Sequence, residues 1–272
     1  MPATARRTFL KTSLLAGFAL AVKPVAASTI QTDTAGLQAG PVQIGDLPAY
    51  RAQPAHAVSP LPTIIVIQEI FGVHEHIQDL CRRLAKQGYL AIAPELYFRQ
   101  GDPRQFSDTS TLVKELVSKV ADEQVLADLD SVAAWAGQHG GNPQRLAVTG
   151  FCWGGRITWL YAAHNPKIKA SAAWYGRLTG QTSSSTPRHP IDIARQIKSP
   201  VLGLYAGKDQ GISLESVEQM RKALRPQPQP FNLVVYDNAS HGFNADYRPS
   251  YHPAAAHDAW ETMLNWFKRF GV

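Results

Sequence analysis

Cysteine is scarce in this sequence, which has two such residues, Cys81 and Cys152, among 272. The two do not form a C-x-x-C motif, and neither has a second cysteine nearby in the sequence that could resolve an oxidised thiol. The sequence therefore disfavours a redox protein. Cys81 falls on a predicted helix and Cys152 at a predicted strand-to-helix turn, so we expect no disulfide between them.

Long apolar runs are also missing. The run Leu14–Val22 is shorter than the roughly 20 residues that span a bilayer, so we expect no stable membrane anchor. It lies between the segment RRTFLK, at residues 6–11, and the small-residue segment that ends at Ala27. This order is typical of a twin-arginine signal peptide over residues 1–27, cleaved after Ala27. We therefore expect a periplasmic or secreted protein that meets the twin-arginine export machinery transiently.

Charge is sparse once this segment is set aside. The chain has a net charge of +6, and residues 1–27 contribute four basic and no acidic side chains, which leaves +2 for the rest. No cluster of lysine and arginine with interleaved aromatic residues remains. We therefore expect no nucleic-acid partner.

The remainder has the composition of a globular protein, with 44% hydrophobic residues. Residues 28–40 are small and polar and predict a flexible leader, and residues 41–272 predict a single domain. Strands are predicted at 42–50, 63–67, 89–93, 145–150, 170–175, 201–205 and 231–236. Helices are predicted at 74–87, 112–120, 123–137, 152–164, 214–224 and 254–270. The alternation predicts an α/β fold with a mostly parallel central sheet and helices on both faces.

Residues 180–190 (GQTSSSTPRHP) predict a mobile loop, which could also border a pocket as a lid.

The segment Gly150-Phe151-Cys152-Trp153-Gly154 has the G-x-nucleophile-x-G pattern of a nucleophile elbow. An apolar strand precedes it and a helix follows, as this motif requires. The glycines avoid steric clashes at a strained turn, and the helix N-terminus favours a thiolate. A small residue that merely fills a tight turn is the alternative for Cys152.

Two further residues complete a catalytic pattern. Asp209 follows the predicted strand at 201–205, and His241 follows the one at 231–236. The order nucleophile, acid, histidine, each just past the carboxyl end of a strand, is typical of a triad in an open α/β sheet. His241 is predicted to transfer protons and Asp209 to orient it.

The loop Gln68–Gly72 follows the first buried strand and predicts one wall of an oxyanion hole. We expect the backbone N–H groups of Ile70 and Trp153 to bind the oxyanion. Glu69 then lies at the mouth of the site, although a carboxylate in a loop is by itself more often simply solvated. No metal site is predicted.

The segments QEIFG, GFCWGG, GKDQG and SHGF together resemble the dienelactone hydrolase family, the carboxymethylenebutenolidase-like α/β-hydrolases. The resemblance covers nearly all of residues 41–270. It implies an α/β-hydrolase fold, no cofactor, and hydrolysis of a small lactone or ester through a cysteine acyl-enzyme. It implies the triad Cys152, Asp209 and His241. It also implies that Glu69 hydrogen-bonds the resting thiol and helps to accept its proton when substrate binds.

The resemblance is weakest where the substrate carboxylate binds. The family holds that group with arginines, one of them a few residues after the catalytic histidine, where this chain has Ala245. The nearest arginine on that loop is Arg248. The other family arginine follows the LY of APELY, where this chain offers Lys114 and Lys119. These departures leave the identity of the lactone or ester open.

Several residues near the expected site are candidates for the substrate pocket. Arg156 is one candidate for receiving an anionic substrate, but a salt bridge on the helix surface is the simpler role for it. The predicted pocket comprises Tyr97, Phe98, Arg99, Trp174, Tyr175, Arg177, Phe243 and Arg248, together with Trp153.

Three functions fit this pattern. The first is the lactone or ester hydrolase described above. The second is a thioesterase or other acyl hydrolase with the same triad, which only a substrate panel would separate from the first. The third is a non-catalytic protein that binds a small ligand, and the complete triad argues against it.

Overall fold

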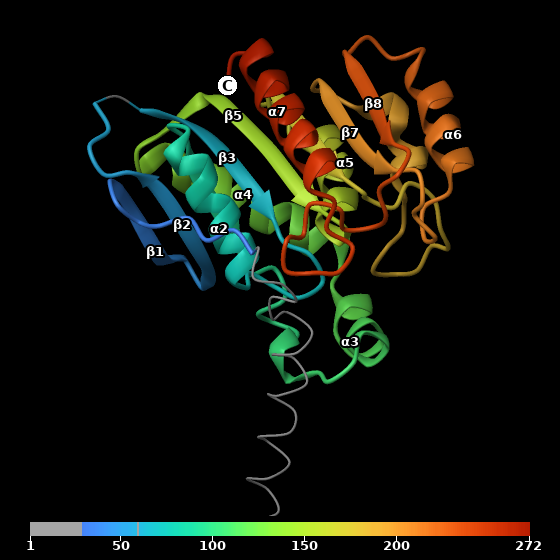
Figure 1. Ribbon diagram of the computed structural model, residues 1–272, viewed down its shortest axis with the longest axis horizontal. Helices are drawn as coiled ribbons and strands as arrows, with labels where there is room; N and C mark the ends of the chain where they lie inside the picture. The colour runs from blue at the N-terminus through green and yellow to red at the C-terminus, as the bar shows by residue number, and fades with distance from the viewer. Residues whose placement is uncertain (1–28, 59) are drawn as a thin grey trace, which may run out of the picture.

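The computed structural model describes residues 29–58 and 60–272, so the predicted signal peptide lies outside the described residues. One eight-stranded sheet, in the order β1-β2-β4-β3-β5-β6-β7-β8, runs through the molecule (Figure 1). The strands from β4 to β8 in this order are parallel, whereas β2 is antiparallel to both β1 and β4. The strands are β1 (Leu37–Ile44), β2 (Leu47–Pro54), β3 (Leu61–Ile67), β4 (Leu90–Pro94), β5 (Gly141–Phe151), β6 (Ala170–Trp174), β7 (Val201–Ala206) and β8 (Phe231–Tyr236).

Helices cover both faces of this sheet, as predicted. In Figure 1, α2 and α7 lie on one face and α4 and α5 on the other. The α-helices are α2 (Glu75–Lys86), α3 (Thr109–Glu115), α4 (Asp122–Gln138), α5 (Trp153–His164), α6 (Leu214–Leu224) and α7 (Pro253–Arg269). Short 3-10 helices are η1 (Pro103–Gln105), η2 (Val117–Lys119) and η3 (Pro190–Gln196).

The pattern of burial explains why these segments take these forms. Every residue of β4, β6 and β7 is buried, because helices cover both faces of the strands. On α2 the buried positions Ile77, Leu80, Cys81 and Leu84 recur at three- and four-residue spacing, which places them on one face. The parallel strands therefore end together at one edge of a well-packed sheet, which is the lower edge in Figure 1.

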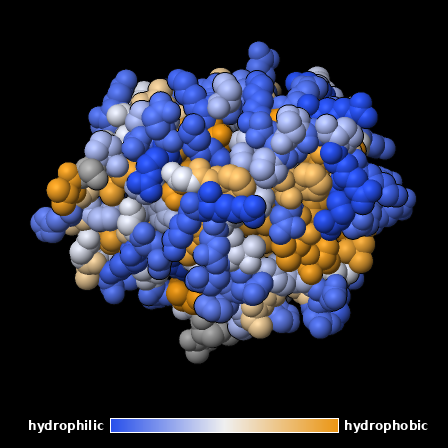
Figure 2. Space-filling view, turned by 90° about the horizontal axis from the view of Figure 1, so that it is seen from above, coloured by the Kyte–Doolittle hydropathy of each residue, from blue (hydrophilic) through white to orange (hydrophobic). Residues whose placement is uncertain are grey.

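The opposite edge of the sheet, viewed in Figure 2, is covered mainly by hydrophilic residues. Hydrophobic residues on that face gather mostly in the half that holds β7 and β8. Among the described residues, no helix combines the length and the apolar character needed to cross a membrane.

The N-terminal segment differs from the predicted flexible leader. Residues 37–40 belong to β1 and pair with β2, because Leu37 and Ala39 pack against the core. Ahead of them, the Thr32 N–H donates to Asp79 Oδ1 at 2.6 Å, and Arg82 Nε donates to the Thr32 carbonyl oxygen at 2.8 Å. The strand predicted at 42–50 is also divided between β1 and β2 by a turn at Gly45, where φ is +61°.

The segment 180–190 is fastened to the rest of the fold. Ser185 Oγ donates to the Ser118 carbonyl oxygen at 2.7 Å, and the Asp122 N–H donates to the Ser185 carbonyl oxygen at 2.9 Å. Arg156 Nη2 donates to the Arg188 carbonyl oxygen at 2.6 Å. The loop therefore lies against the N-terminus of α4 and the side of α5.

Candidate active site

Cys152 connects β5 to α5 at a sharp turn. Its backbone has φ 57° and ψ −113°, a conformation that side-chain-bearing residues adopt only under constraint. The Cys152 N–H donates to the Trp174 carbonyl oxygen at 3.0 Å, which anchors the turn to β6. A Cβ at Gly154 would lie 2.5 Å from the carbonyl oxygens of Ile67 and Gln68. Glycine is therefore required here, because the start of α5 packs directly on the end of β3.

The three predicted triad residues meet at the carboxyl edge of the sheet. His241 Nε2 lies 3.2 Å from Cys152 Sγ, and His241 Nδ1 lies 2.7 Å from Asp209 Oδ2. Asp209 Oδ1 accepts from the N–H groups of Gly211, at 2.8 Å, and Ile212, at 3.1 Å. Both oxygens of Asp209 are thus occupied, so the carboxylate holds a fixed position beside the imidazole.

The surroundings of His241 favour its protonated form. Burial opposes the imidazolium, but Asp209 and the Cys152 sulfur outweigh burial and raise the pKa of His241 to about 10. A protonated imidazole beside the sulfur is the partner that a thiolate needs.

The two predicted oxyanion-hole donors are available. Trp153 is the first residue of α5, and Ile70 lies in the turn after β3. Within the part of the chain that the structure describes, neither backbone N–H donates to an acceptor. The tight contact of Gly154 with the end of β3 brings these two turns together.

Glu69 is buried rather than solvated, with 1% of its surface exposed. Tyr247 Oη donates to Glu69 Oε2 at 2.7 Å, and His74 Nε2 lies 3.6 Å from the same oxygen. Burial raises the pKa of Glu69, but His74, His76 and Arg248 together lower it more, to about 2. Glu69 is therefore ionised.

The expected hydrogen bond between Glu69 and the resting thiol is not the arrangement that the structure records. Cys152 pairs with His241, and Glu69 pairs with Tyr247 and His74. The donor at 2.7 Å is on the loop after His241, and His74 directly precedes α2. Glu69 Oε1 is buried and has no partner among the described residues, so it keeps a free acceptor position.

A buried cluster behind Glu69 was missed from the sequence. Asp246 accepts from His76 Nδ1, at 3.2 Å, and from Arg83 Nη2, and Arg83 Nε also donates to Asp79 Oδ2 at 2.5 Å. The ring of Tyr247 packs against His74 and His76. This Asp246 clasp joins the loop after His241 to α2. In the sequence, the segments HEH (residues 74–76) and NADYR (residues 244–248) are rich in polar residues. This composition does not indicate which of these residues pair with each other.

The predicted pocket residues divide into two groups. Tyr97 and Tyr175 are fully buried, their hydroxyls have no partner among the described residues, and Tyr97 meets Trp153 edge to face at 4.9 Å. Trp174 donates to Thr149 and stacks on Phe151, and Phe243 is buried against Trp174. Trp174 and Phe243 therefore belong to the aromatic core beneath the site rather than to its wall.

The candidate arginines also differ from one another. Arg99 stacks on Phe98 and is engaged by Asp128, at 2.7 Å, and Asp46, at 3.5 Å. Arg156 is buried and forms two 2.7 Å hydrogen bonds with Asp122, so its salt bridge is internal rather than on the surface. These ion pairs make both guanidinium groups unavailable to an anionic substrate.

Arg248 and Arg177 have no such carboxylate partner among the described residues. Arg177 is exposed. Arg248 is partly buried, and its guanidinium lies 5.8 Å from the centre of the Phe71 ring. Burial lowers the pKa of Arg248, but Glu69, Tyr247 and Cys152 raise it more. Arg248 is therefore a cation, and its Nη1 lies 3.5 Å from the position that a Cβ would take on Gly242, the residue after His241, although its sequence position departs from the family pattern.

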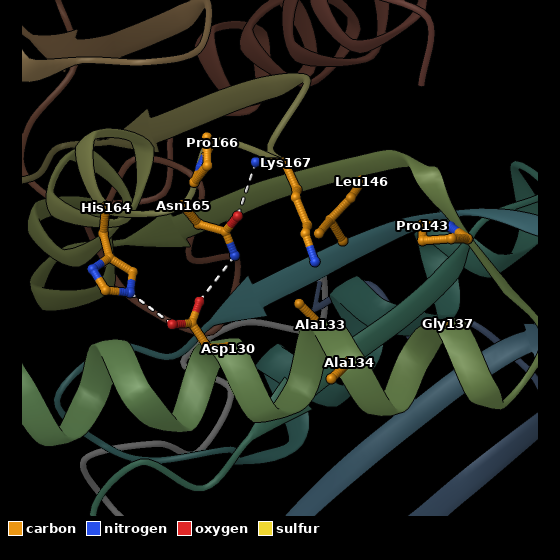
Figure 3. Close-up of a pocket in the computed structure, with 10 residues that line it drawn as sticks. All are labelled: Asp130, Ala133, Ala134, Gly137, Pro143, Leu146, His164, Asn165, Pro166 and Lys167. Carbon is orange, nitrogen blue, oxygen red and sulfur yellow. Dashed lines mark hydrogen bonds and ion pairs between the residues drawn. The ribbon is translucent and has the colours of Figure 1, made fainter.

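Two surface cavities lie away from this site. One, of about 310 Å³, is formed by α4, the start of β5 and the end of α5 (Figure 3), and none of the predicted site residues lines it. Asp130 in this cavity already binds His164, Asn165 and Tyr161. A second cavity, of about 670 Å³, shares Asp130 and His164 and extends toward η3. No group of acidic, histidine and cysteine residues suited to a metal ion occurs among the described residues.

Comparisons with known proteins agree with the fold. The crystal structure of a protein from Klebsiella pneumoniae, described as a "Putative Dienelactone Hydrolase", has a TM-score of 0.85 and 60% sequence identity with this chain. The match covers 86% of this chain and 99% of that one.

Sequence comparisons point the same way. A protein of Escherichia coli K12 described as a "Putative carboxymethylenebutenolidase" is 57% identical over 266 residues, which cover 96% of this chain and 98% of that protein. A Bradyrhizobium protein described as a "Probable 2-oxo-3-(5-oxofuran-2-ylidene)propanoate lactonase" is 31% identical over 220 residues, with 79% and 86% covered. The dienelactone hydrolase family model matches residues 47–271. Because that match spans most of the chain, this protein belongs to the dienelactone hydrolase family of α/β-hydrolase enzymes.

Proposed function

We propose that this enzyme hydrolyses a small lactone or ester, as a carboxymethylenebutenolidase does, through an acyl-enzyme on Cys152. One observation carries the proposal: His241 lies between the Cys152 sulfur, at 3.2 Å, and the Asp209 carboxylate, at 2.7 Å. This is the arrangement in which a base activates a nucleophile and a third group orients the base.

The first half-reaction forms a thioester. The Cys152 thiolate attacks the carbonyl carbon while His241 carries the proton as an imidazolium. The N–H groups of Ile70 and Trp153 bind the developing oxyanion. When the tetrahedral intermediate collapses, the C–O bond breaks and His241 gives its proton to the leaving oxygen. In a lactone the leaving hydroxyl stays attached to the acyl group, so this step opens the ring.

The second half-reaction releases the acid. His241, now neutral, takes a proton from water, and the resulting hydroxide adds to the thioester carbon. The C–S bond then breaks, and Cys152 leaves as a thiolate beside the imidazolium. Asp209 stabilises the imidazolium in both steps.

Glu69 is proposed to take part at the start of the cycle. The free acceptor position at Oε1 supports a group that accepts the thiol proton as substrate enters. The contact with His74 lowers the pKa of Glu69, so the carboxylate becomes a stronger base when it leaves that contact. This role requires Glu69 to turn toward Cys152 from its present partners, Tyr247 and His74.

The substrate class is proposed from Arg248. The Arg248 guanidinium is partly buried next to Gly242, the residue after His241, and has no carboxylate partner among the described residues, which favours an acyl group that carries a carboxylate. The Bradyrhizobium relative is named for a lactone with a propanoate group, which has this chemistry.

Export is proposed from the sequence alone. Arg6 and Arg7, the apolar run that follows them and the small residues before Ser28 support a twin-arginine signal peptide and a periplasmic or secreted enzyme. That route carries folded proteins, so the Cys152 thiol would be enclosed in its site before it leaves the reducing cytoplasm.

The nucleophile is tested with p-nitrophenyl acetate and with iodoacetamide. We expect wild-type enzyme to show turnover and to lose it on alkylation of Cys152, and Cys152→Ala to be inactive. Cys81→Ala is the matched control, because Cys81 is fully buried on α2. Undiminished hydrolysis by Cys152→Ala would remove Cys152 from the mechanism. A panel that includes thioesters separates this proposal from a thioesterase.

A further inference from the structure

Tyr175 follows β6 directly and has a strained backbone. Its φ is 37°, and among the described residues Cys152 is the only other non-glycine residue with a positive φ. Strain of this kind persists only where the surroundings impose it, and it is concentrated at functional sites. Here the Tyr175 N–H donates to the Leu204 carbonyl oxygen at 2.8 Å.

The next residue fixes the turn from the other side. Gly176 approaches the backbone of Gly155 so closely that a Cβ there would lie 2.3 Å from the Gly155 carbonyl carbon. Strand β7 and helix α5 therefore hold Tyr175 in place together, and α5 is the helix that presents Cys152.

The Tyr175 side chain reaches the reacting groups. Its ring meets His241 edge to face at 5.1 Å, and it meets Phe243 in the same way at 5.3 Å. The residue is fully buried, yet its hydroxyl has no hydrogen-bond partner within the described residues. A buried hydroxyl without a partner is costly, which favours a partner that arrives with the ligand.

This hydroxyl is a donor. Burial raises the pKa of Tyr175 well above its usual range, Glu69 and Cys152 raise it further, and Arg248 acts in the opposite direction. Geometry brings Tyr175 and Arg248 to the same part of the site: the Tyr175 ring contacts His241, and Arg248 Nη1 lies 3.5 Å from the position that a Cβ would take on Gly242, the residue after His241. Tyr247 already donates to Glu69, whereas the Tyr175 hydroxyl and the Arg248 guanidinium have no hydrogen-bond acceptor among the described residues.

We propose that Tyr175 is a substrate-binding residue, whose hydroxyl joins Arg248 in binding a carboxylate on the acyl part of the substrate. The inference rests on the proposed hydrolysis at Cys152 and adds a specificity residue to it. A neutral donor and a cation that each hydrogen-bond one oxygen of the same carboxylate select for that group by hydrogen-bond geometry as well as by charge.

The test compares two esters that differ only at the end remote from the reacting bond. They are the p-nitrophenyl half-ester of adipic acid, which ends in a carboxylate, and p-nitrophenyl hexanoate, which ends in a methyl group. Tyr175→Phe keeps the ring and removes the hydroxyl. We expect its kcat/KM to fall about tenfold for the half-ester relative to hexanoate, the effect of losing a hydrogen bond to a charged group.

Tyr205→Phe is the matched control, because Tyr205 is a buried tyrosine of β7 whose hydroxyl accepts from Trp159 at 3.0 Å. It is expected to leave the selectivity between the two esters unchanged. Equal loss on both esters in Tyr175→Phe, or no loss on either, would overturn the proposal.

A second measurement does not depend on hydrolysis. Adipate should protect Cys152 from iodoacetamide, and the concentration that gives half-protection should rise about tenfold in Tyr175→Phe. Unchanged protection would contradict the role of Tyr175. If wild-type enzyme cleaves neither ester faster than Cys152→Ala does, the proposed hydrolysis fails, and the protection experiment still decides the binding role.

Discussion

At the scale of single residues, the site depends on backbone constraint as much as on side-chain chemistry. Cys152 and Tyr175 both have positive φ, and each is followed within two residues by a glycine in close backbone contact. The contacts of Gly154 and Gly176 hold these two conformations in place. They place Cys152 and Tyr175 at the same edge of the sheet, where His241 contacts the sulfur of one and the ring of the other.

The Asp209–His241 pair predicts a pH dependence. The pKa of His241 is raised to about 10, so the imidazolium is present below that pH and is lost above it. We expect kcat/KM to hold through the neutral range and to fall as pH approaches 10. Asp209→Asn removes the charge that supports the imidazolium, so the alkaline fall should move to lower pH and activity at neutral pH should drop about a hundredfold or more.

The measurement is a pH profile of ester hydrolysis for both forms. Asp237→Asn serves as the control, because Asp237 is exposed in the turn after β8. An alkaline limb that stays in place in Asp209→Asn would show that Asp209 does not set the protonation of His241.

At the scale of elements, the loop between β8 and α7 concentrates the chemistry. It carries His241, Tyr247 and Arg248, and it contains no helix or strand of its own, so contacts made elsewhere must hold it. The Asp246 clasp does this by tying the loop to α2, and α2 follows the turn that carries Glu69 and Ile70. The two halves of the site are therefore linked behind the reacting groups.

Asp246→Asn tests the clasp. It weakens the bonds to His76 and Arg83, while Arg83 keeps Asp79 as a partner. We expect a loss of about 1.5–3 kcal/mol in the free energy of unfolding, as for a hydrogen bond to a charged group. We also expect kcat to fall, because the loop that carries His241 is less firmly placed. Urea unfolding and ester kinetics measure the two effects.

Asp258→Asn is the matched variant, because Asp258 accepts from Tyr236 on the surface, at 2.8 Å, outside the loop. A kcat that survives in Asp246→Asn while stability falls would make the clasp structural only.

At the scale of the whole molecule, the fold gathers distant parts of the chain. Glu69, Cys152, Asp209 and His241 follow β3, β5, β7 and β8, and parallel strands bring their carboxyl ends to one edge. The segment beyond the predicted signal peptide is part of this unit, because Thr32 bonds Asp79 and Arg82 on α2.

The proposed export is tested by replacing Arg6 and Arg7 with lysine. The twin-arginine export machinery recognises these two arginines. We therefore expect the double variant to stay in the cytoplasm and the wild type to reach the periplasm or medium. Cell fractionation with immunoblotting measures this. Lys23→Arg is the control and should export normally. Equal export of the double variant would exclude this route.

The sequence by itself determined the fold class and the family, and it singled out Cys152, Asp209 and His241, which the structure brings into contact. Local patterns encode these features, since alternating strand and helix signals specify layers and a glycine-flanked turn specifies an elbow. The sequence could not supply the pairing of Glu69 with Tyr247, the internal bond of Arg156 or the strand formed by residues 37–40. Each depends on residues far apart in the chain.

Only the tertiary structure decided which charged groups are available to a substrate. Arg99 and Arg156 look equivalent to Arg248 in the sequence, yet carboxylates engage the first two and leave the third without such a partner among the described residues. The physical reason is that a buried or half-buried charged side chain forms an ion pair with the oppositely charged group that packing places beside it. That choice is made by the approach of elements across the sheet, and so is the placement of the Tyr175 ring beside His241.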